Sequence, residues 1–380
     1  MSLYSRDDER AIRQQRMVDD WARSGLMSQE QRDRVMPDLQ VDLRRTNRAL
    51  RATLFVFGFL IVNAFAGLAV VFLEDVIALT TLRWVALAAA GVALAVAHLL
   101  VTRYQLYHFG VEEAVAIAAG VFFTIFAAQS AVTWSTLLAF GGATVAAIVL
   151  FIRFNYAYAA VAATVLATLV IFDLEVVDTV RRLLAFVLLL TIFFVARERR
   201  VDTDPDYPAD IYGLVEAVAW AGMYVVANLK ISAWISAPDE VAAFYWGTYV
   251  VIWLLPAAGL WMAISDRHRA LLDINILLAI VTLMSNKPYL GAAQKPWDPI
   301  LFGLLLIATA VGLRRWLASG ANGSRSGIIA TRILESERER LALAGTATVF
   351  APGAPPANAE DPPPLFGGGA SGGGGASGNF

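Results

Sequence analysis

Cysteine is absent from this chain of 380 residues. The absence excludes disulfide bonds, thiolate metal sites and cysteine nucleophiles. Histidine is scarce as well, and His98, His108 and His268 are not spaced as ligands of one metal ion. We therefore expect neither a metal site nor a cofactor.

Charge is also scarce, because charged residues make up 16% of the chain, whereas a soluble domain carries about 25%. The formal net charge is −2 at pH 7, so nothing favours a nucleic-acid partner. Lys230, Lys287 and Lys295 are the only lysines, and arginine supplies the other basic residues. Together with abundant alanine and valine, this usage is typical of a bacterial gene of high GC content.

Apolar residues take the place of charge: they form 58% of the chain, and the mean hydropathy is +0.59. They gather in ten stretches, at residues 52–73, 84–101, 114–132, 137–152, 157–172, 183–196, 212–227, 242–264, 271–284 and 300–313. A membrane-spanning helix needs about 20 mostly apolar residues. The pattern predicts an all-α, polytopic transmembrane helix bundle of about ten spans. The ninth stretch is short, and a re-entrant ninth segment would move the C-terminus to the other side.

The arginines predict how this bundle is threaded, because cytoplasmic loops retain positive charge. With the N-terminus inside, the inside loops hold Arg103, Arg153, Arg197, Arg199, Arg200, Arg267, Arg269, Arg314 and Arg315. Arg181 and Arg182 fall outside, where they either snorkel to the interface or pair with Asp178. We expect a multi-pass protein of the bacterial inner membrane with both termini in the cytoplasm.

Residues 1–51 form a polar cytoplasmic segment that we expect to fold as a short helical hairpin. Gly25 stands where a C-cap glycine ends a helix. Ser28 and Gln31 form a capping-box pattern that begins a second helix, and Pro37 ends it. The hairpin either lies against the membrane face or serves as a docking module for a partner.

The transmembrane domain covers residues 52–317, and the chain turns polar after it. Residues 318–351 form a cytoplasmic surface segment, in which we expect one short helix over 328–343. Residues 352–380 are rich in proline and glycine and cannot bury a core, so we expect a disordered tail.

Polar residues inside the spans are candidates for function, because placing them in hydrocarbon is costly. Glu216 begins the seventh stretch, and Asp273 and Asn275 begin the ninth, at a similar predicted depth. The two carboxylates together could bind a cation, relay protons or act as acid and base. Alternatively, they reach the inner interface or pair with Arg267 and Arg269.

The last outer loop, residues 286–299, carries a Lys-Pro-aromatic pattern twice. Lys287 lies beside Tyr289, and Lys295 lies beside Trp297. Such a loop could hold a phosphate or carboxylate against the aromatic rings. The alternative is ordinary anchoring, since all three residue types are common at membrane interfaces.

Three stretches carry a resemblance to other proteins: residues 21–31 (Trp-Ala-Arg-Ser-Gly-Leu-Met-Ser-Gln-Glu-Gln), the loop at 286–299, and Arg-Arg-Trp-Leu at 314–317. In these stretches and in its layout, the chain resembles uncharacterised bacterial polytopic inner-membrane proteins of the domain-of-unknown-function kind. The resemblance implies no known activity and no catalytic residue.

Three function classes remain open. We favour a non-enzymatic membrane protein that binds or moves a small molecule or lipid. The second class is a scaffold or sensor that contacts other membrane proteins through the N-terminal hairpin and the tail. The third is a membrane enzyme that acts on a lipid-linked substrate through Glu216 and Asp273. The oligomeric state is open, and the lipid bilayer is the expected partner in every case.

Overall fold

The computed structural model describes residues 3–73, 79–130, 135–203, 211–231, 242–266, 268–292, 295, 297–320, 324, 325, 328 and 329. The chain divides into two compact units, and the division falls inside the first helix. The first unit comprises Met1–Arg13 and Leu39–Ala330, and it contains all the apolar helices. Of the second unit, Gln14–Asp38 is described.

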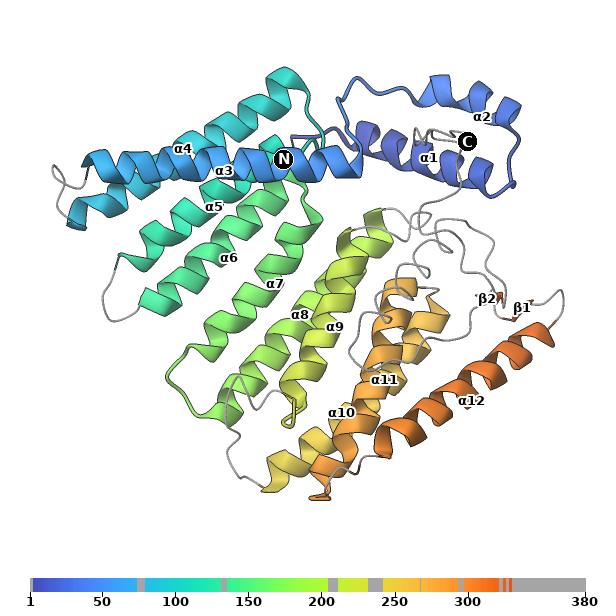
Figure 1. The fold of residues 1–380 in the computed structure, drawn as a ribbon. Helices are drawn as coiled ribbons and strands as arrows, with labels where there is room; N and C mark the ends of the chain where they lie inside the picture. The colour runs from blue at the N-terminus through green and yellow to red at the C-terminus, as the bar shows by residue number, and fades with distance from the viewer. Residues whose placement is uncertain are drawn as a thin grey trace, which may run out of the picture. The chain divides into compact units, whose positions relative to one another are not determined.

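The described residues are almost entirely helical, as Figure 1 shows. The polar N-terminal elements are α1 (Arg6–Arg23), α2 (Gln29–Val35) and the 3-10 turn η1 (Met36–Leu39). The apolar helices are α3 (Arg48–Leu73), α4 (Leu79–Tyr104), α5 (Val111–Ala128), α6 (Ser135–Phe154), α7 (Ala157–Phe172), α8 (Asp178–Thr203), α9 (Ile211–Ala227), α10 (Ala242–Ser265), α11 (Arg269–Tyr289) and α12 (Asp298–Ala318).

The predicted local signals of the N-terminal hairpin are confirmed. Gly25 follows α1 with a positive φ of 73°, a backbone conformation that favours glycine. The Ser28 hydroxyl accepts a hydrogen bond from the Gln31 N–H at 3.2 Å, and the Gln31 side chain accepts one from the Ser28 N–H at 2.9 Å. An ion pair of 2.8 Å between Asp19 and Arg32 then joins α1 to α2.

Within the described residues, seven helices are long and apolar enough to cross a membrane: α3, α4, α5, α6, α8, α10 and α11. The helices α7 and α9 are apolar but have only 16 and 17 residues. The helix α12 has 21 residues and is not among the seven. The structure therefore confirms an all-α, multi-pass architecture, whereas the count of ten spans stays a prediction.

Most consecutive helices pack side by side within the first unit. The helices α4 to α7 each contact the next one, and α3 packs on α5. The helices α8, α9, α10 and α11 form a second group around Trp220, Met223 and Tyr224 of α9. Glycine permits close approach between neighbouring helices, as where Gly142 of α6 faces Ala127 of α5 and Gly222 of α9 faces Leu189 of α8.

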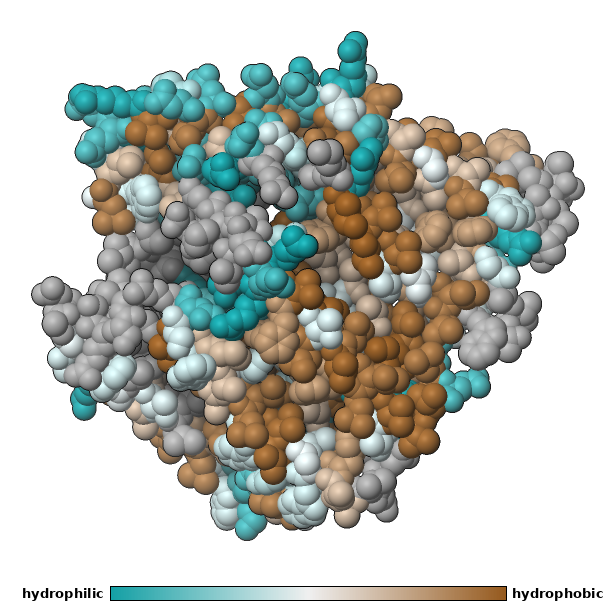
Figure 2. All heavy atoms as spheres, turned by 180° about the vertical axis from the view of Figure 1, so that it is seen from behind, coloured by the Kyte–Doolittle hydropathy of each residue, from teal (hydrophilic) through white to brown (hydrophobic). Residues whose placement is uncertain are grey.

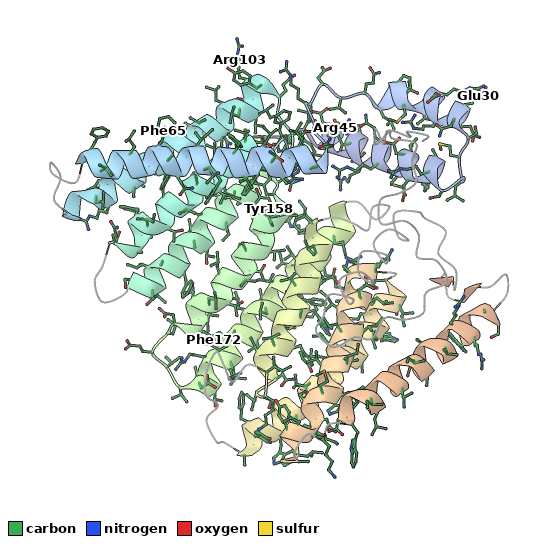
Figure 3. All side chains as sticks on the ribbon, in the orientation of Figure 1. Glu30, Arg45, Phe65, Arg103, Tyr158 and Phe172 are labelled. Carbon is green, nitrogen blue, oxygen red and sulfur yellow. The ribbon has the colours of Figure 1, made fainter. Side chains whose placement is uncertain are left out.

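Large apolar side chains cover much of the outside of the first unit. Figure 2 shows them over much of the face that it presents. Phe65 on α3 is an example: it is 70% exposed and projects away from the neighbouring helices (Figure 3). Exposure of such side chains to water would be unfavourable, whereas contact with lipid is favourable.

The C-terminal segment differs from its prediction where it is described. Ser324–Arg325 (β1) pairs antiparallel with Ile328–Ile329 (β2), so the helix predicted over 328–343 is wrong at its first two residues. The intervening sequence is Ser-Gly, a combination that favours a tight turn over a helix. The rest of that predicted helix, and the predicted disordered tail at 352–380, lie outside the described residues.

Candidate functional site

Glu216, a predicted site residue, lies fully buried on α9, where it faces α8. Its Oε2 accepts a hydrogen bond of 2.7 Å from Arg200 Nε, and Arg197 lies 3.7 Å from its Oε1. Arg197 also forms an ion pair of 2.7 Å with Asp266, which follows α10. Two arginines and two carboxylates thus balance each other in this network.

The predicted partnership between Glu216 and Asp273 does not form. The Asp273 side chain is 64% exposed, and it lies 3.8 Å from Arg269 on the same helix. The second carboxylate of the network is instead Asp266. It was missed because its arginine-rich sequence surroundings are typical of an ordinary cytoplasmic loop.

His268 lies beside this network and caps the N-terminus of α11. Its Nδ1 accepts a hydrogen bond of 3.2 Å from the Leu271 N–H. Its Nε2 is buried and has no hydrogen-bond partner within the described part of the chain. Burial, and then the positive charge of Arg200, lower the pKa of His268 to about 4. The ring is therefore neutral at physiological pH.

Asn275, the third predicted residue in the spans, is completely buried between α9, α10 and α11. Its Oδ1 accepts a hydrogen bond of 2.8 Å from Trp220 Nε1, and its Nδ2 donates one of 2.7 Å to the Leu271 carbonyl. Gly259 of α10 makes room for it, because a Cβ at that position would overlap the Asn275 amide. Every polar atom of the amide group except one hydrogen is thus paired.

Further hydrogen bonds continue this pairing along α9 and α11. The Tyr224 and Thr282 hydroxyls lie 2.8 Å apart, and Asn228 Nδ2 donates to the Ser285 hydroxyl at 3.0 Å. We define the polar seam as the buried polar residues that face each other along these helices: Glu216, Trp220 and Tyr224 of α9 with Asn228 directly after it, and Asn275, Thr282, Ser285 and Tyr289 of α11. The seam members on α9 recur every four residues, a spacing visible in the sequence that predicts one helix face.

The four residues of the predicted outer loop are placed in three different settings. Tyr289 is buried at the end of the polar seam, where its hydroxyl accepts a hydrogen bond of 2.7 Å from the Leu229 N–H. Lys287 Nζ pairs with Asp298 at 2.5 Å. Lys295 Nζ lies 5.0 Å from the centre of the Trp297 ring, a cation–π contact.

This arrangement bears directly on the predicted anion site. The Asp298 carboxylate accepts a hydrogen bond from Lys287 Nζ. It also accepts one of 2.8 Å from the Lys295 backbone N–H. An internal carboxylate thus supplies the negative charge that the loop was expected to take from a ligand. A shared anion site at Lys287 and Lys295 stays a prediction, and a ligand there would have to displace Asp298.

A second polar cluster, missed from the sequence, lies where α3 meets the start of α5. Arg51 Nε donates a hydrogen bond of 2.9 Å to Glu113, and His108 Nδ1 lies 2.6 Å from the same carboxylate. The neighbouring Glu112 is completely buried, and its Oε2 has no partner within the described residues. Gly110 has a φ of 112° and packs against the Arg51 carbonyl, so no larger residue fits there.

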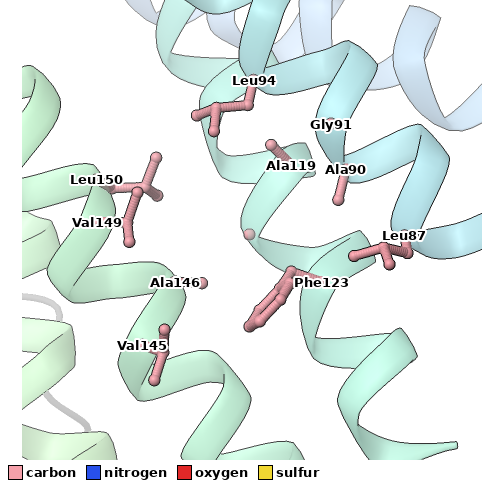
Figure 4. Close-up of a pocket in the computed structure, with 11 residues that line it drawn as sticks. Leu87, Ala90, Gly91, Leu94, Ala119, Phe123, Val145, Ala146, Val149 and Leu150 are labelled. Atoms are coloured by element: carbon pink, nitrogen blue, oxygen red, sulfur yellow. The ribbon is translucent and has the colours of Figure 1, made fainter.

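Two cavities in the described part of the chain are apolar. One, which we call the groove, has a volume of about 410 Å³ and lies between α4, α5 and α6 (Figure 4). Its lining is Leu87, Ala90, Gly91 and Leu94 of α4, Ala119, Gly120 and Phe123 of α5, and Val145, Ala146, Val149 and Leu150 of α6. A second cavity of about 430 Å³ lies between α6, α7, α8 and α9.

Small residues create the groove. Gly91 on one wall and Gly120 on the floor have no side chain, and a Cβ at Gly91 would meet no atom within 4 Å. Sequence analysis could not find this feature, because its residues come from three helices and each resembles a close-packing residue when considered alone.

The fold and these sites define a multi-pass helical membrane protein. No protein-family model, no curated protein and no solved structure matches the chain.

Proposed function

We propose that this protein binds the acyl chain of a membrane lipid in the groove between α4, α5 and α6. The observation that carries the proposal is the cavity itself. Its volume of about 410 Å³ lies within the range of about 300–1,000 Å³ that is usual for ligand sites. Its lining offers no side-chain hydrogen bond, so it suits an apolar ligand and not a polar one.

The selectivity of such a site would come from shape. Within a bilayer the surrounding lipid is as apolar as the groove, so the hydrophobic effect does not drive a chain into it. Binding then depends on van der Waals contact with the two walls and the floor. The open space at Gly91 is the part of the groove where a chain would make contacts that the protein lacks.

The proposal includes the setting predicted from the sequence. The protein would lie in a bacterial inner membrane, with about ten spans and cytoplasmic termini. The seven long apolar helices support a multi-pass arrangement, and the arginine distribution supports its orientation.

The two other function classes receive less support. The enzyme interpretation relied on a pair formed by Glu216 and Asp273, and these residues lie in different surroundings. The scaffold interpretation relied on the N-terminal hairpin and on a tail that lies outside the described residues.

The test is identification of lipids that remain bound after purification in mild detergent, by native mass spectrometry. Gly91→Leu should fill the groove without steric conflict, because its Cβ position is open. We expect bound lipid in the unmodified protein and at least a tenfold loss in this variant. Gly247→Leu on α10 is the matched control, since that site is equally open but does not line the groove. Equal lipid retention in both variants would overturn the proposal.

A further inference from the structure

Arg153 continues one wall of the groove beyond its apolar part. It follows Leu150 by three residues and Ala146 by seven on α6, so helical spacing places it on the groove-lining face. The residue is exposed, and its side chain makes no ion pair or hydrogen bond within the described part of the chain. A positive charge without a partner among the described residues therefore stands at this end of the groove.

The opposite wall also becomes polar at this end. His98 follows Leu94 by four residues and Gly91 by seven on α4, so it belongs to the same face as the groove lining. The residue is half-buried, and its Nδ1 has no hydrogen-bond partner among the described residues. Both walls thus change from apolar to polar within about one helical turn of the groove.

The position of Arg153 along its helix matches a lipid headgroup. It is the last residue but one of α6, which ends at Phe154. The ends of membrane-spanning helices lie near the headgroup layer, and a long arginine side chain reaches that layer easily. An amphiphile with its chain in the groove would therefore place its headgroup beside Arg153.

The acidic groups at this end do not cancel the charge of Arg153. Glu112 and Glu113 are both buried at the start of α5. Glu113 is paired with Arg51, and the Glu9 carboxylate accepts hydrogen bonds of 2.8 and 2.9 Å from Asn155.

We propose that this end of the groove binds the phosphate group of an anionic phospholipid through Arg153. The inference rests on the proposed function, because it adds a headgroup site to the acyl-chain site. A guanidinium presents paired N–H donors that match two phosphate oxygens. The ligand class is thus a lipid that carries both a phosphate and a net negative charge.

Arg103 provides a matched control at the same end of the helices. It follows Leu94 by nine residues on α4, about two and a half turns, so it lies on the face opposite the groove. Figure 3 shows Arg103 near the end of α4, directed away from the neighbouring helices. Arg103 and Arg153 are both exposed and carry the same charge. They differ in the helix face on which they lie.

The experiment is a native mass spectrometry titration of the full-length protein with two lipids that have identical acyl chains. Phosphatidylglycerol carries the anionic phosphate, and diacylglycerol lacks it. We expect Arg153→Gln to weaken phosphatidylglycerol binding about fivefold, the usual effect of one basic residue at a membrane surface. Diacylglycerol binding should not change, Arg153→Lys should restore part of the loss, and Arg103→Gln should have no effect.

The outcomes separate this inference from the proposed function. If Arg153→Gln binds phosphatidylglycerol as well as the unmodified protein does, or if Arg103→Gln weakens it equally, the headgroup site is wrong. In that case, loss of binding of both lipids in Gly91→Leu would still support the proposed acyl-chain site. If neither lipid binds to the unmodified protein, both proposals fall.

Discussion

The charge of Glu216 is compatible with a membrane interior only because other charges surround it. A buried carboxylate is costly unless it is paired and hydrogen-bonded. Arg200 supplies a charge-assisted hydrogen bond, and Arg197 joins Glu216 to Asp266. The role best supported for this residue is therefore cohesion between α8, α9 and the turn after α10, and not binding of a free cation.

Glu216→Gln should destabilise the protein, because the two arginines would lose one of their two counter-charges. Removal of one partner from a buried pair costs about 3–5 kcal/mol. We expect about 3 kcal/mol, the lower end, because Asp266 still offsets part of the charge. Thermal unfolding in detergent measures the change. Asp273→Asn is the control, and it should alter stability by less than about 0.5 kcal/mol since that side chain is exposed. Equal effects of the two variants would contradict this account of the network.

His268 predicts a dependence of stability on pH. Its pKa is about 4 in the folded protein, against about 6.5 in an unfolded chain. As pH falls from about 6.5 to about 4, the unfolded chain takes up a proton that the folded protein does not bind. Stability is therefore fully present above pH 6.5 and declines through this window, by up to about 3 kcal/mol from this residue.

His268→Asn isolates this contribution, because asparagine can still cap α11 but does not titrate. The stability difference between the two proteins should shift in favour of the variant as pH falls from about 6.5 to about 4. Other titrating groups are common to both and cancel in the comparison. A difference that stays constant across this range would show that His268 takes up its proton normally in the folded state.

At the scale of helices, the polar seam explains how α9, short as it is, is held in the bundle. Its buried polar residues each find a partner on α11 or nearby, as in Trp220–Asn275 and Tyr224–Thr282. In a membrane such hydrogen bonds contribute about 0.6 kcal/mol each on average. Their number and alignment therefore matter more than any single bond.

Gly259 on α10 tests the packing of this seam. Gly259→Ala should destabilise the protein by about 1–3 kcal/mol, because the added methyl group overlaps Asn275. The double variant Gly259→Ala with Asn275→Ala should recover part of this loss, so the two effects should not be additive. Gly247→Ala on the same helix has open space and should be neutral or slightly stabilising. Additive effects in thermal unfolding would mean that the helices shift to absorb the methyl group.

Local signals were sufficient to predict some helix ends. The caps at Gly25 and Ser28 depend on residues only a few positions apart, and both predictions are confirmed. The pairing of Arg182 with Asp178, one of two alternatives, is confirmed at 2.6 Å for the same reason. The apolar stretches likewise predicted the all-α, multi-pass class, because helix length and composition suffice for it.

The sites could not be predicted in the same way, because they depend on which helices become neighbours. Glu216 was singled out as a polar residue within a predicted span, but its partners Arg200 and Arg197 lie 16 and 19 positions away on another helix. The groove is harder still, since it is a space left by small residues on three helices. Neither the partners of Glu216 nor the groove corresponds to a residue spacing that can be recognised in the sequence.

For the molecule as a whole, the number of spans decides which side of the membrane holds each site. Ten spans require α7, α9 and α12 to cross the bilayer along with the seven longer helices. The 16 residues of α7 reach about 24 Å as a helix, whereas the hydrocarbon core is about 30 Å thick. Flanking residues or local thinning of the bilayer would have to supply the difference.

Reporter fusions after Arg200 and after Arg315 test this count through its parity. If the N-terminus is cytoplasmic and α7 crosses the membrane, six spans precede Arg200 and the reporter there should be cytoplasmic. If α7 does not cross, five spans precede Arg200 and the reporter should be periplasmic. A cytoplasmic signal at both positions is the expected result. A cytoplasmic signal at Arg200 with a periplasmic signal at Arg315 would mean that one of α9 to α12 does not span, and the Tyr289 end of the polar seam would then need a new assignment.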